Sequence, residues 1–336
     1  MRAVLLPQRT PVGLLLAVAL VCATPAARAV ENIDVDLFRP QFTWSLSSIP
    51  NAEFSKDSEC RTLAGGGCGG EYGATTGSLG ANIPLGKTHI RTEGRVRAWQ
   101  LLANVRFDGE SADLTFLNES PRKLYDGGLN LAGLWLTEKS NLWLVSAGAS
   151  YAEDTLTMFH PSLRFSALAV VAHPSSAKWT WLWGGAFTYQ YGRALPLPLV
   201  GFLWKPSDRW LVASIVPITI RAAYTATEHL TVQFGAGVHG NAYRLSNNGL
   251  FPQEPDTVFF RYVELRLTGG IEYRVGPHLT LAAEGGVAGA RHIVISENDR
   301  GTGDEIRVGS PEPAPVALVS ARVTFGMNLL ERMKSE

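Results

Sequence analysis

The segment Val316-Ala-Leu-Val-Ser-Ala-Arg-Val-Thr-Phe-Gly-Met-Asn-Leu329 alternates apolar with polar or small residues near the end of the chain. Successive side chains of an extended strand point to opposite faces, so Val319 and Phe325 share an apolar face while Arg322 and Thr324 share a polar one. The segment is longer than most strands of soluble proteins and long enough to cross a bilayer when tilted. Because similar segments recur along the chain, the sequence predicts an all-β fold, a transmembrane antiparallel up-and-down β-barrel.

The N-terminus carries the three parts of a secretory signal peptide. Arg2 and Arg9 give a positive start, residues 12–23 form a short apolar run, and Ala27-Arg28-Ala29 is an A-x-A cleavage site. We expect residues 1–29 to be removed and residues 30–336 to form one barrel domain. The alternative is a retained anchor helix, for which the apolar run is too short. These features predict the outer membrane of a Gram-negative bacterium, with outer-membrane lipid and the barrel assembly machinery as partners.

Two cysteines remain in the predicted mature chain, in Cys60-Arg-Thr-Leu-Ala-Gly-Gly-Gly-Cys68. An exported protein meets an oxidising compartment, and glycines let a short loop close without strain, so we expect a disulfide between Cys60 and Cys68. A metal site is the alternative, but two thiolates without a nearby histidine are too few ligands. We expect neither a metal nor another cofactor.

The composition narrows the class of protein further. The 30 basic and 30 acidic residues cancel, which speaks against a nucleic-acid partner or a polybasic membrane anchor. Hydrophobic residues make up 46% of the chain, yet no segment after the signal peptide is long enough for a transmembrane helix. The apolar residues are spread over alternating segments instead, as a barrel wall requires.

Turn and loop signals give an estimate of the strand number. The expected short turns are 138–141, 173–178, 205–209, 225–229 and 276–278, and the expected long loops include 49–73, 107–126 and 292–314. Bacterial outer-membrane barrels place short turns at one end, long loops at the other, and have an even number of strands. Pro217 must then turn the chain between two short strands near 210–216 and 218–224. The count is about fourteen strands, with twelve as the alternative.

Aromatic residues cluster beside the expected short turns. Aromatic rings with polar edges prefer the headgroup level of a membrane, so these residues predict an aromatic belt at one rim. The alternative is the core of a soluble β-sandwich, which gives no reason for clustering beside alternate turns. The residues are Trp135, Trp143, Trp179, Trp181, Trp204, Trp210, Tyr224 and Tyr273.

Four segments carry a resemblance to a known family: Leu195-Pro-Leu-Pro-Leu-Val-Gly201, Trp204-Lys-Pro-Ser-Asp-Arg-Trp210, Val216-Pro217 and Arg261-Tyr-Val-Glu-Leu-Arg266. In these the chain resembles a family of uncharacterised bacterial outer-membrane barrels, a domain-of-unknown-function group, over roughly residues 120–329. Barrel chains often finish on an aromatic residue that the assembly machinery reads. The expected departure here is that Phe325 lies inside the last strand and a charged tail follows it. The resemblance implies the barrel fold and the location, and it brings no established activity.

Polar residues on the faces opposite the apolar ones are expected to line the barrel interior, because a charge on the lipid face costs up to roughly 2–4 kcal/mol at the bilayer centre. They either brace the wall or form a polar constriction that selects solutes. The expected residues of the lumen are Gln233, His239, Asn241, Tyr262, Glu264, Arg266, Glu272, Arg274, Glu284 and Arg322.

No catalytic motif fits its required context, so we expect that the protein is not an enzyme. Residues 235–240 match G-x-G-x-x-G but lie inside an alternating strand, without the following helix that a dinucleotide site needs. The leading hypothesis is a passive, porin-like channel for small polar solutes, because a wall of about fourteen strands leaves more interior than side chains readily fill. The alternatives are a structural or surface-interaction barrel without a pore and, third, a lipid hydrolase at the rim that pairs His239 with Ser246 or Ser296.

Overall fold

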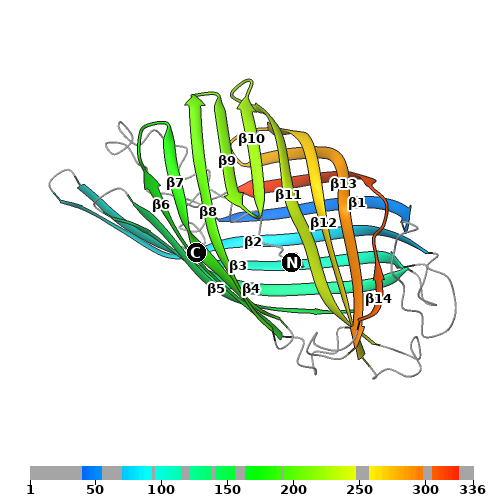
Figure 1. Cartoon of the computed structure of the whole chain (residues 1–336). Coiled ribbons are helices and arrows are strands. Elements are labelled where there is room, and N and C mark those ends of the chain that lie inside the picture. The colour runs from blue at the N-terminus through cyan, green and yellow to red at the C-terminus, as the bar shows by residue number, and fades with distance from the viewer. Residues whose placement is uncertain are drawn as a thin grey trace, which may run out of the picture.

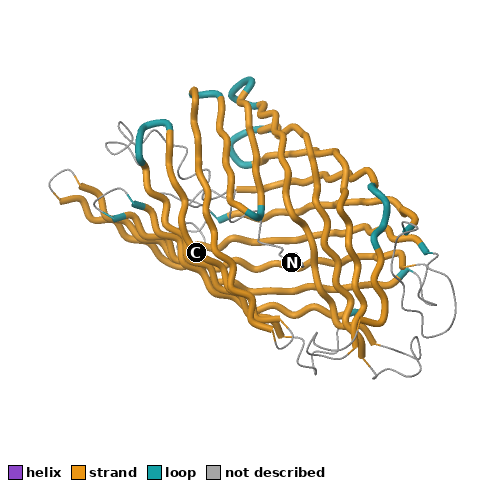
Figure 2. Tube along the Cα trace, in the orientation of Figure 1, coloured by secondary structure: helices purple, strands orange, loops and turns teal. Residues whose placement is uncertain are grey.

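The computed structural model describes residues 40–54, 70–92, 95–114, 121–137, 141–155, 163–190, 193–246, 257–297 and 305–324. Within these ranges the chain consists of strands and their connections, and no helix long and apolar enough to cross a membrane occurs in them (Figure 2). The predicted signal peptide, Cys60, Cys68, Phe325 and residues 326–336 lie outside the described residues.

The strands form one closed antiparallel barrel in which nearly every strand pairs with the next along the chain (Figure 1). The first and last strands close the ring, with Gln41 opposite Thr324. β14 pairs with one half of β13 and β15 with the other half, so the two together occupy one place in a fourteen-strand wall. The strands are β1 (Gln41–Glu53), β2 (Glu71–Thr92), β3 (Arg95–Leu114), β4 (Arg122–Leu136), β5 (Leu142–Glu153), β6 (Leu163–Pro174), β7 (Trp179–Gln190), β8 (Arg193–Ser207), β9 (Trp210–Val216), β10 (Thr219–Thr225), β11 (Leu230–Ser246), β12 (Thr257–Arg274), β13 (Leu279–Glu297), β14 (Glu305–Gly309) and β15 (Ala314–Thr324).

The sequence prediction of an all-β barrel with about fourteen strands is confirmed. The alternation has its expected consequence: large apolar side chains such as Trp135 and Leu267 are 62% and 57% exposed on the outside. Their neighbours in the chain, such as Leu134 and Thr268, point inward. We call the end of the barrel with the connections 137–141, 175–178, 208–209, 226–229 and 275–278 the turn end, and the opposite end the loop end.

Two of the expected loops are wrong in extent. The predicted loop 107–126 is mostly strand, because β3 continues to Leu114 and β4 begins at Arg122. The predicted loop 292–314 contains the end of β13 and all of β14. In the first of these places, Asp108 and Glu110 are buried, inward-facing residues of the long strand β3. By contrast, the two short strands expected around Pro217 are present as β9 and β10.

The two largest apolar clusters of the interior lie at different heights. The first lies on the inner faces of β3 to β9 and includes Leu134, Leu182, Leu199 and Ile218. The second lies nearer the loop end, between β2–β5 on one side and β11–β13 on the other, and its Tyr243, Leu245 and Phe260 are fully buried. The barrel is therefore filled by side chains over much of its loop half.

The wall is interrupted in one place among the described strands, where β9 and β10 form a hairpin shorter than its neighbours (Figure 1). β9 pairs with β8 only from Val200 toward the turn end, and β10 pairs with β11 only as far as Gly237. The loop half of β11 instead crosses to the far wall, where Arg244 is paired with Glu153 at the end of β5. At Gly201, where β8 begins to pair with β9, an added Cβ would lie 2.1 Å from the carbonyl oxygen of Ser214, so this close approach requires glycine.

Candidate functional site in the barrel interior

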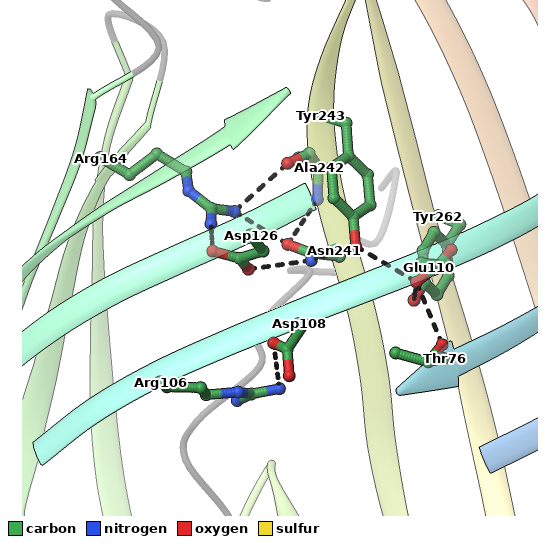
Figure 3. Close-up of polar contacts among 10 residues, drawn as sticks. All are labelled: Thr76, Arg106, Asp108, Glu110, Asp126, Arg164, Asn241, Ala242, Tyr243 and Tyr262. Atoms are coloured by element: carbon green, nitrogen blue, oxygen red, sulfur yellow. Dashed lines mark hydrogen bonds and ion pairs between the residues drawn. The ribbon is translucent and has the colours of Figure 1, made fainter. Parts of the chain in front are cut away.

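Arg164 on β6 is the centre of a buried polar network in the loop half (Figure 3). Its guanidinium group forms an ion pair of 2.5 Å with Asp126 on β4 and donates hydrogen bonds to the side-chain oxygen of Asn241, 2.8 Å away, and to Ser150. It also donates to the carbonyl oxygen of Ala242. Because guanidinium has donors in a fixed planar arrangement, one side chain connects β4, β5, β6 and β11.

The network continues through tyrosine hydroxyls to a second carboxylate. Asn241 donates to Tyr243 at 2.7 Å, and Tyr243 donates to Glu110 at 3.2 Å. Tyr262 and Thr76 donate to the same oxygen of Glu110, at 3.1 and 3.4 Å (Figure 3). These residues come from β2, β3, β11 and β12, so hydrogen bonds span the lumen from one wall to the other.

A third group is built around Glu264 on β12. Its two carboxylate oxygens contact Arg266 at 2.6 Å and Arg291 at 3.3 Å, and Glu264 and Arg291 are each only 1% exposed. The Arg291 guanidinium lies 4.9 Å from the centre of the Tyr72 ring, in a cation–π arrangement. It also donates to the carbonyl oxygen of Glu312, so this group ties β12, β13 and β2 to the segment before β15.

The crossing of β11 to the far wall is held by Asp154 at the end of β5. Asp154 pairs with Arg122 at 2.6 Å and accepts a hydrogen bond from the backbone N–H of Ser246 at 2.9 Å. Arg122 in turn donates to the carbonyl oxygen of Ser246. The loop half of the barrel is thus closed by charge-assisted hydrogen bonds as well as by apolar packing.

The turn half of the interior differs, because its polar groups reach water. Arg221 on β10 pairs with Glu284 on β13 at 3.2 Å, and their side chains are 24% and 14% exposed. Gln233 and Thr268 donate to the same carboxylate at 2.8 and 3.4 Å. The part of the wall that runs from β10 through β13 and β15 to β1 and β2 is polar here. The part from β3 to β9 carries the first apolar cluster.

All ten residues expected in the lumen lie at inward positions of their strands. The structure brings Asn241 and Tyr262 into the network around Arg164 and Glu110, Glu264 together with Arg266, and Gln233 together with Glu284. Glu272, Arg274 and Arg322 lie toward the turn end, away from the closed loop half, and His239 lies between the two halves. The four expected inward charges of β12 therefore divide between two environments.

The aromatic residues expected in a belt lie at outward positions near the turn end. Trp135 stands between Trp99 and Trp143 on adjacent strands, so three tryptophans form a row on the outer surface. Trp179 is half-buried, and its ring stacks on that of Phe202 with the ring centres 4.9 Å apart. Trp210 and Tyr224 face each other with ring centres 5.0 Å apart.

The sequence prediction missed most of the buried charges. Asp108 and Glu110 were assigned to a loop, although they alternate with Phe107 and Gly109 as an inward face requires. Arg164 stands in the same way between the exposed apolar residues Leu163 and Phe165. The signal that could have identified these charges is the same period of two that identified the strands.

The geometry does not assemble the hydrolase pair. His239 points inward on β11, whereas Ser246 on the same strand and Ser296 on β13 occupy outward positions. Ser246 uses its hydroxyl to donate to Asp154 at 3.2 Å. Among the residues that the structure describes, no group of three or more His, Cys, Asp and Glu side chains is arranged to hold a metal ion.

A closed antiparallel wall with an apolar outer surface, aromatic rows at one rim and charges inside defines an outer-membrane-type β-barrel. The chain belongs to the family described as Domain of unknown function (DUF6268), which matches residues 41–301. The resemblance to an uncharacterised barrel family is thereby confirmed, and the match begins well before residue 120.

Solved structures with a similar fold include an outer membrane channel from Pseudomonas putida F1, with 6% identity, a TM-score of 0.43, and coverage of 85% of this chain and 96% of that one. The translocator domain of the autotransporter NalP from Neisseria meningitidis has 10% identity, a TM-score of 0.34, and coverage of 92% and 97%. OccK7 (OpdD) from Pseudomonas aeruginosa has 8% identity, a TM-score of 0.34, and coverage of 86% and 100%. No curated protein matches the chain. At these identities the likeness is one of fold alone.

Proposed function

We propose that the protein is a passive conduit for small polar solutes in the outer membrane of a Gram-negative bacterium. The observation that carries this proposal is Arg221, which pairs with Glu284 on the interior wall of the turn half and is 24% exposed. Charged groups that face water inside a membrane barrel mark a solute-accessible lumen. Short turns of such barrels face the periplasm, so the accessible half is the periplasmic one.

The loop half is then the narrow end of the conduit. Glu264 and Arg291 are almost fully buried, and Tyr243 and Tyr262 bind Glu110 on the facing wall. Removing one partner of a buried pair is strongly destabilising, so these pairs also hold the narrow end together. In this proposal the loop half sets the size of the passage and the turn half sets its charge preference.

The second candidate is a barrel without a pore that acts through its structure or surface. The filled loop half favours it, because the expectation that the wall is too wide to be filled by side chains does not hold there. The barrel is narrowed by the crossing of β11 to β5, which a strand count does not reveal. Conductance separates the two candidates.

The test is single-channel recording in planar bilayers of the natural protein and of the double variant Glu264→Ala/Arg291→Ala. The natural protein should conduct weakly, and the variant should conduct more, because two large side chains are removed from the narrow end. Asp208→Asn, at an exposed turn position, is the matched control and should behave like the natural protein. Folding of each variant is checked by heat-modifiable migration. If neither the natural protein nor the folded double variant conducts, the conduit proposal is overturned. The second candidate, a barrel without a pore, is then favoured.

A further inference from the structure

The interrupted wall leaves two strand edges facing each other across the space beyond the Pro217–Ile218 turn. On one side, residues 193–199 of β8 pair with β7 but have no partner in β9. On the other side, residues 238–246 of β11 pair with β12 but extend beyond the end of β10. Figure 1 shows β9 and β10 ending between the longer β8 and β11. Unsatisfied backbone groups are expensive in hydrocarbon, so an interruption at this place needs a physical explanation.

Two prolines remove the hydrogen-bond donors from the open edge of β8. The backbone N–H of Lys205 donates to Lys178 beside β7, and the β7–β8 register runs without a shift from Trp204 to Arg193. Odd-numbered residues of β8 therefore direct their N–H groups to β7, and even-numbered residues direct theirs to the other side. Pro196 and Pro198 occupy even positions. The edge that faces the interruption thus lacks donors at both places, which is the position that proline tolerates in a sheet.

On the open edge of β11, three residues have backbone groups bound by side chains or by the backbone of Asp154. The N–H of Val238 donates to the carbonyl oxygen of Ile218, so the even-numbered residues of β11 direct their backbone groups to the interruption. Ala242 accepts from Arg164 and its N–H donates to Asn241. Arg244 accepts from the N–H of Asp154, and Ser246 is bound through both of its backbone groups by Asp154 and Arg122.

Prolines on β8 and bound backbone groups on β11 therefore hinder the pairing of β8 with β11 across the interruption, which is built into the fold. It lies within the apolar part of the outer surface: Val200, Val216, Ile220 and Phe234 around it are all exposed. Exposed apolar residues also continue beyond it toward the loop end, as Phe187 and Leu265 show. The interruption between β8 and β11 thus lies at the level of the lipid chains rather than at the loop-end surface, and the side chains beside it, such as Leu199 and Ile218, are buried.

The surroundings of the interruption change from apolar to polar toward the interior. Val216 is 61% exposed on the outside, and Ile218 and Leu199 belong to the apolar cluster just inside. Next to them the imidazole of His239 lies beside Thr219, close to Gly237. A molecule at this place would meet hydrocarbon-like side chains first and hydrogen-bonding groups behind them.

We propose that the interruption between β8 and β11 is a lateral portal through which a single-chain amphiphile moves between the membrane and the barrel interior. The chain of the amphiphile lies against Leu199 and Ile218, and its polar head reaches Thr219 and His239. The inference builds on the proposed conduit and gives it a second opening, because the straight route to the loop end is filled by Tyr243, Leu245 and Phe260.

The test uses the full-length protein in phosphatidylcholine vesicles and a dodecyl alcohol probe that carries a diazirine in its chain. After illumination, the labelled residues are mapped by mass spectrometry. We expect labels on the inward residues Leu197, Leu199, Ile218 and Thr219 in addition to the outward apolar surface. Labels confined to outward residues such as Val216 and Leu267 would overturn the portal.

A pair of variants separates the portal from general contact with lipid. His239→Trp fills the space behind the turn and should lower the labelling of inward residues about tenfold, which corresponds to ~1.4 kcal/mol of lost affinity. Thr231→Trp, on the same inward face of β11 but at the turn end, should leave it unchanged. Equal inward labelling in the two folded variants would reject this route. Ion conductance without inward labelling would keep the conduit and reject the portal alone, so the two proposals fail separately.

Discussion

Replacing Arg164 by methionine should strongly destabilise the barrel, because Arg164 connects four strands across the loop half. Methionine preserves much of the length of the side chain but removes its contacts with Asp126, Asn241, Ser150 and the backbone of Ala242. Arg164 and Asp126 are 8% and 14% exposed, so water compensates little for the lost partner. Removing one member of a buried ion pair costs roughly 3–5 kcal/mol, and we expect a loss in this range.

The free energy of unfolding is measured by urea titration in phosphatidylcholine vesicles, followed by tryptophan fluorescence and by heat-modifiable migration. Lys205→Met is the matched control, since it removes an ion pair whose acidic partner, Asp208, is 99% exposed. Exposed pairs contribute little to stability, so the unfolding midpoint of this control should stay close to that of the natural protein.

A double-mutant cycle with Asp126→Asn tests whether the loss arises at the ion pair. The two changes should couple by roughly 1–3 kcal/mol, as for other residues that share one hydrogen-bond network. Additive effects within about 0.5 kcal/mol, or a methionine variant as stable as the natural protein, would refute the proposed role of Arg164.

Three further predictions concern location, the cysteines and the inward charges. The mature protein should fractionate with the outer membrane and migrate in a heat-modifiable way, and its recovery from the soluble periplasm would contradict the location. Cys60 and Cys68 should form a disulfide, seen as a two-proton mass deficit in the unreduced protein, whereas free thiols on folded protein would reject it. Arg266→Glu combined with Arg274→Glu should shift ion preference toward cations, because negative charges replace positive ones on the interior wall. It should also lower thermal stability, since Arg266 pairs with Glu264 at 2.6 Å. Unchanged selectivity together with unchanged stability would show that these residues form no such network.

Much of the wall could be predicted from the sequence because its signal is local. The alternation along residues 261–275 identifies which side chains of β12 point inward, and the turns around Pro217 and Gly276 identify where strands end. The strand number follows from those turns and from parity. None of these inferences requires knowledge of which strands meet across the barrel.

The arrangement of the interior could not be predicted, because it depends on contacts between strands that are distant in sequence. Nothing local to Arg244 or Glu153 indicates that β11 crosses to β5, and this crossing decides that the loop half is filled. In the same way, Glu264 was expected to lie inside, but its second partner, Arg291, lies in a bulge that shifts the register of β13. Long-range packing selects the partners of buried charges, and periodicity selects only their face.

The seam between β1 and β15 has a consequence for the order of assembly. Apart from the pairing of β13 with β15, which skips only β14, every other pairing around the ring joins strands that follow each other along the chain, so those ladders can form from local hairpins. The seam joins Gln41 to Thr324 and pairs Ser48 with Ala317. It is therefore the step with the longest loop to close and the largest sequence separation between partners, the two features that slow folding. We expect the curled sheet to form first and ring closure to limit the rate, so substitutions in the seam should slow folding more than equally destabilising substitutions within a hairpin.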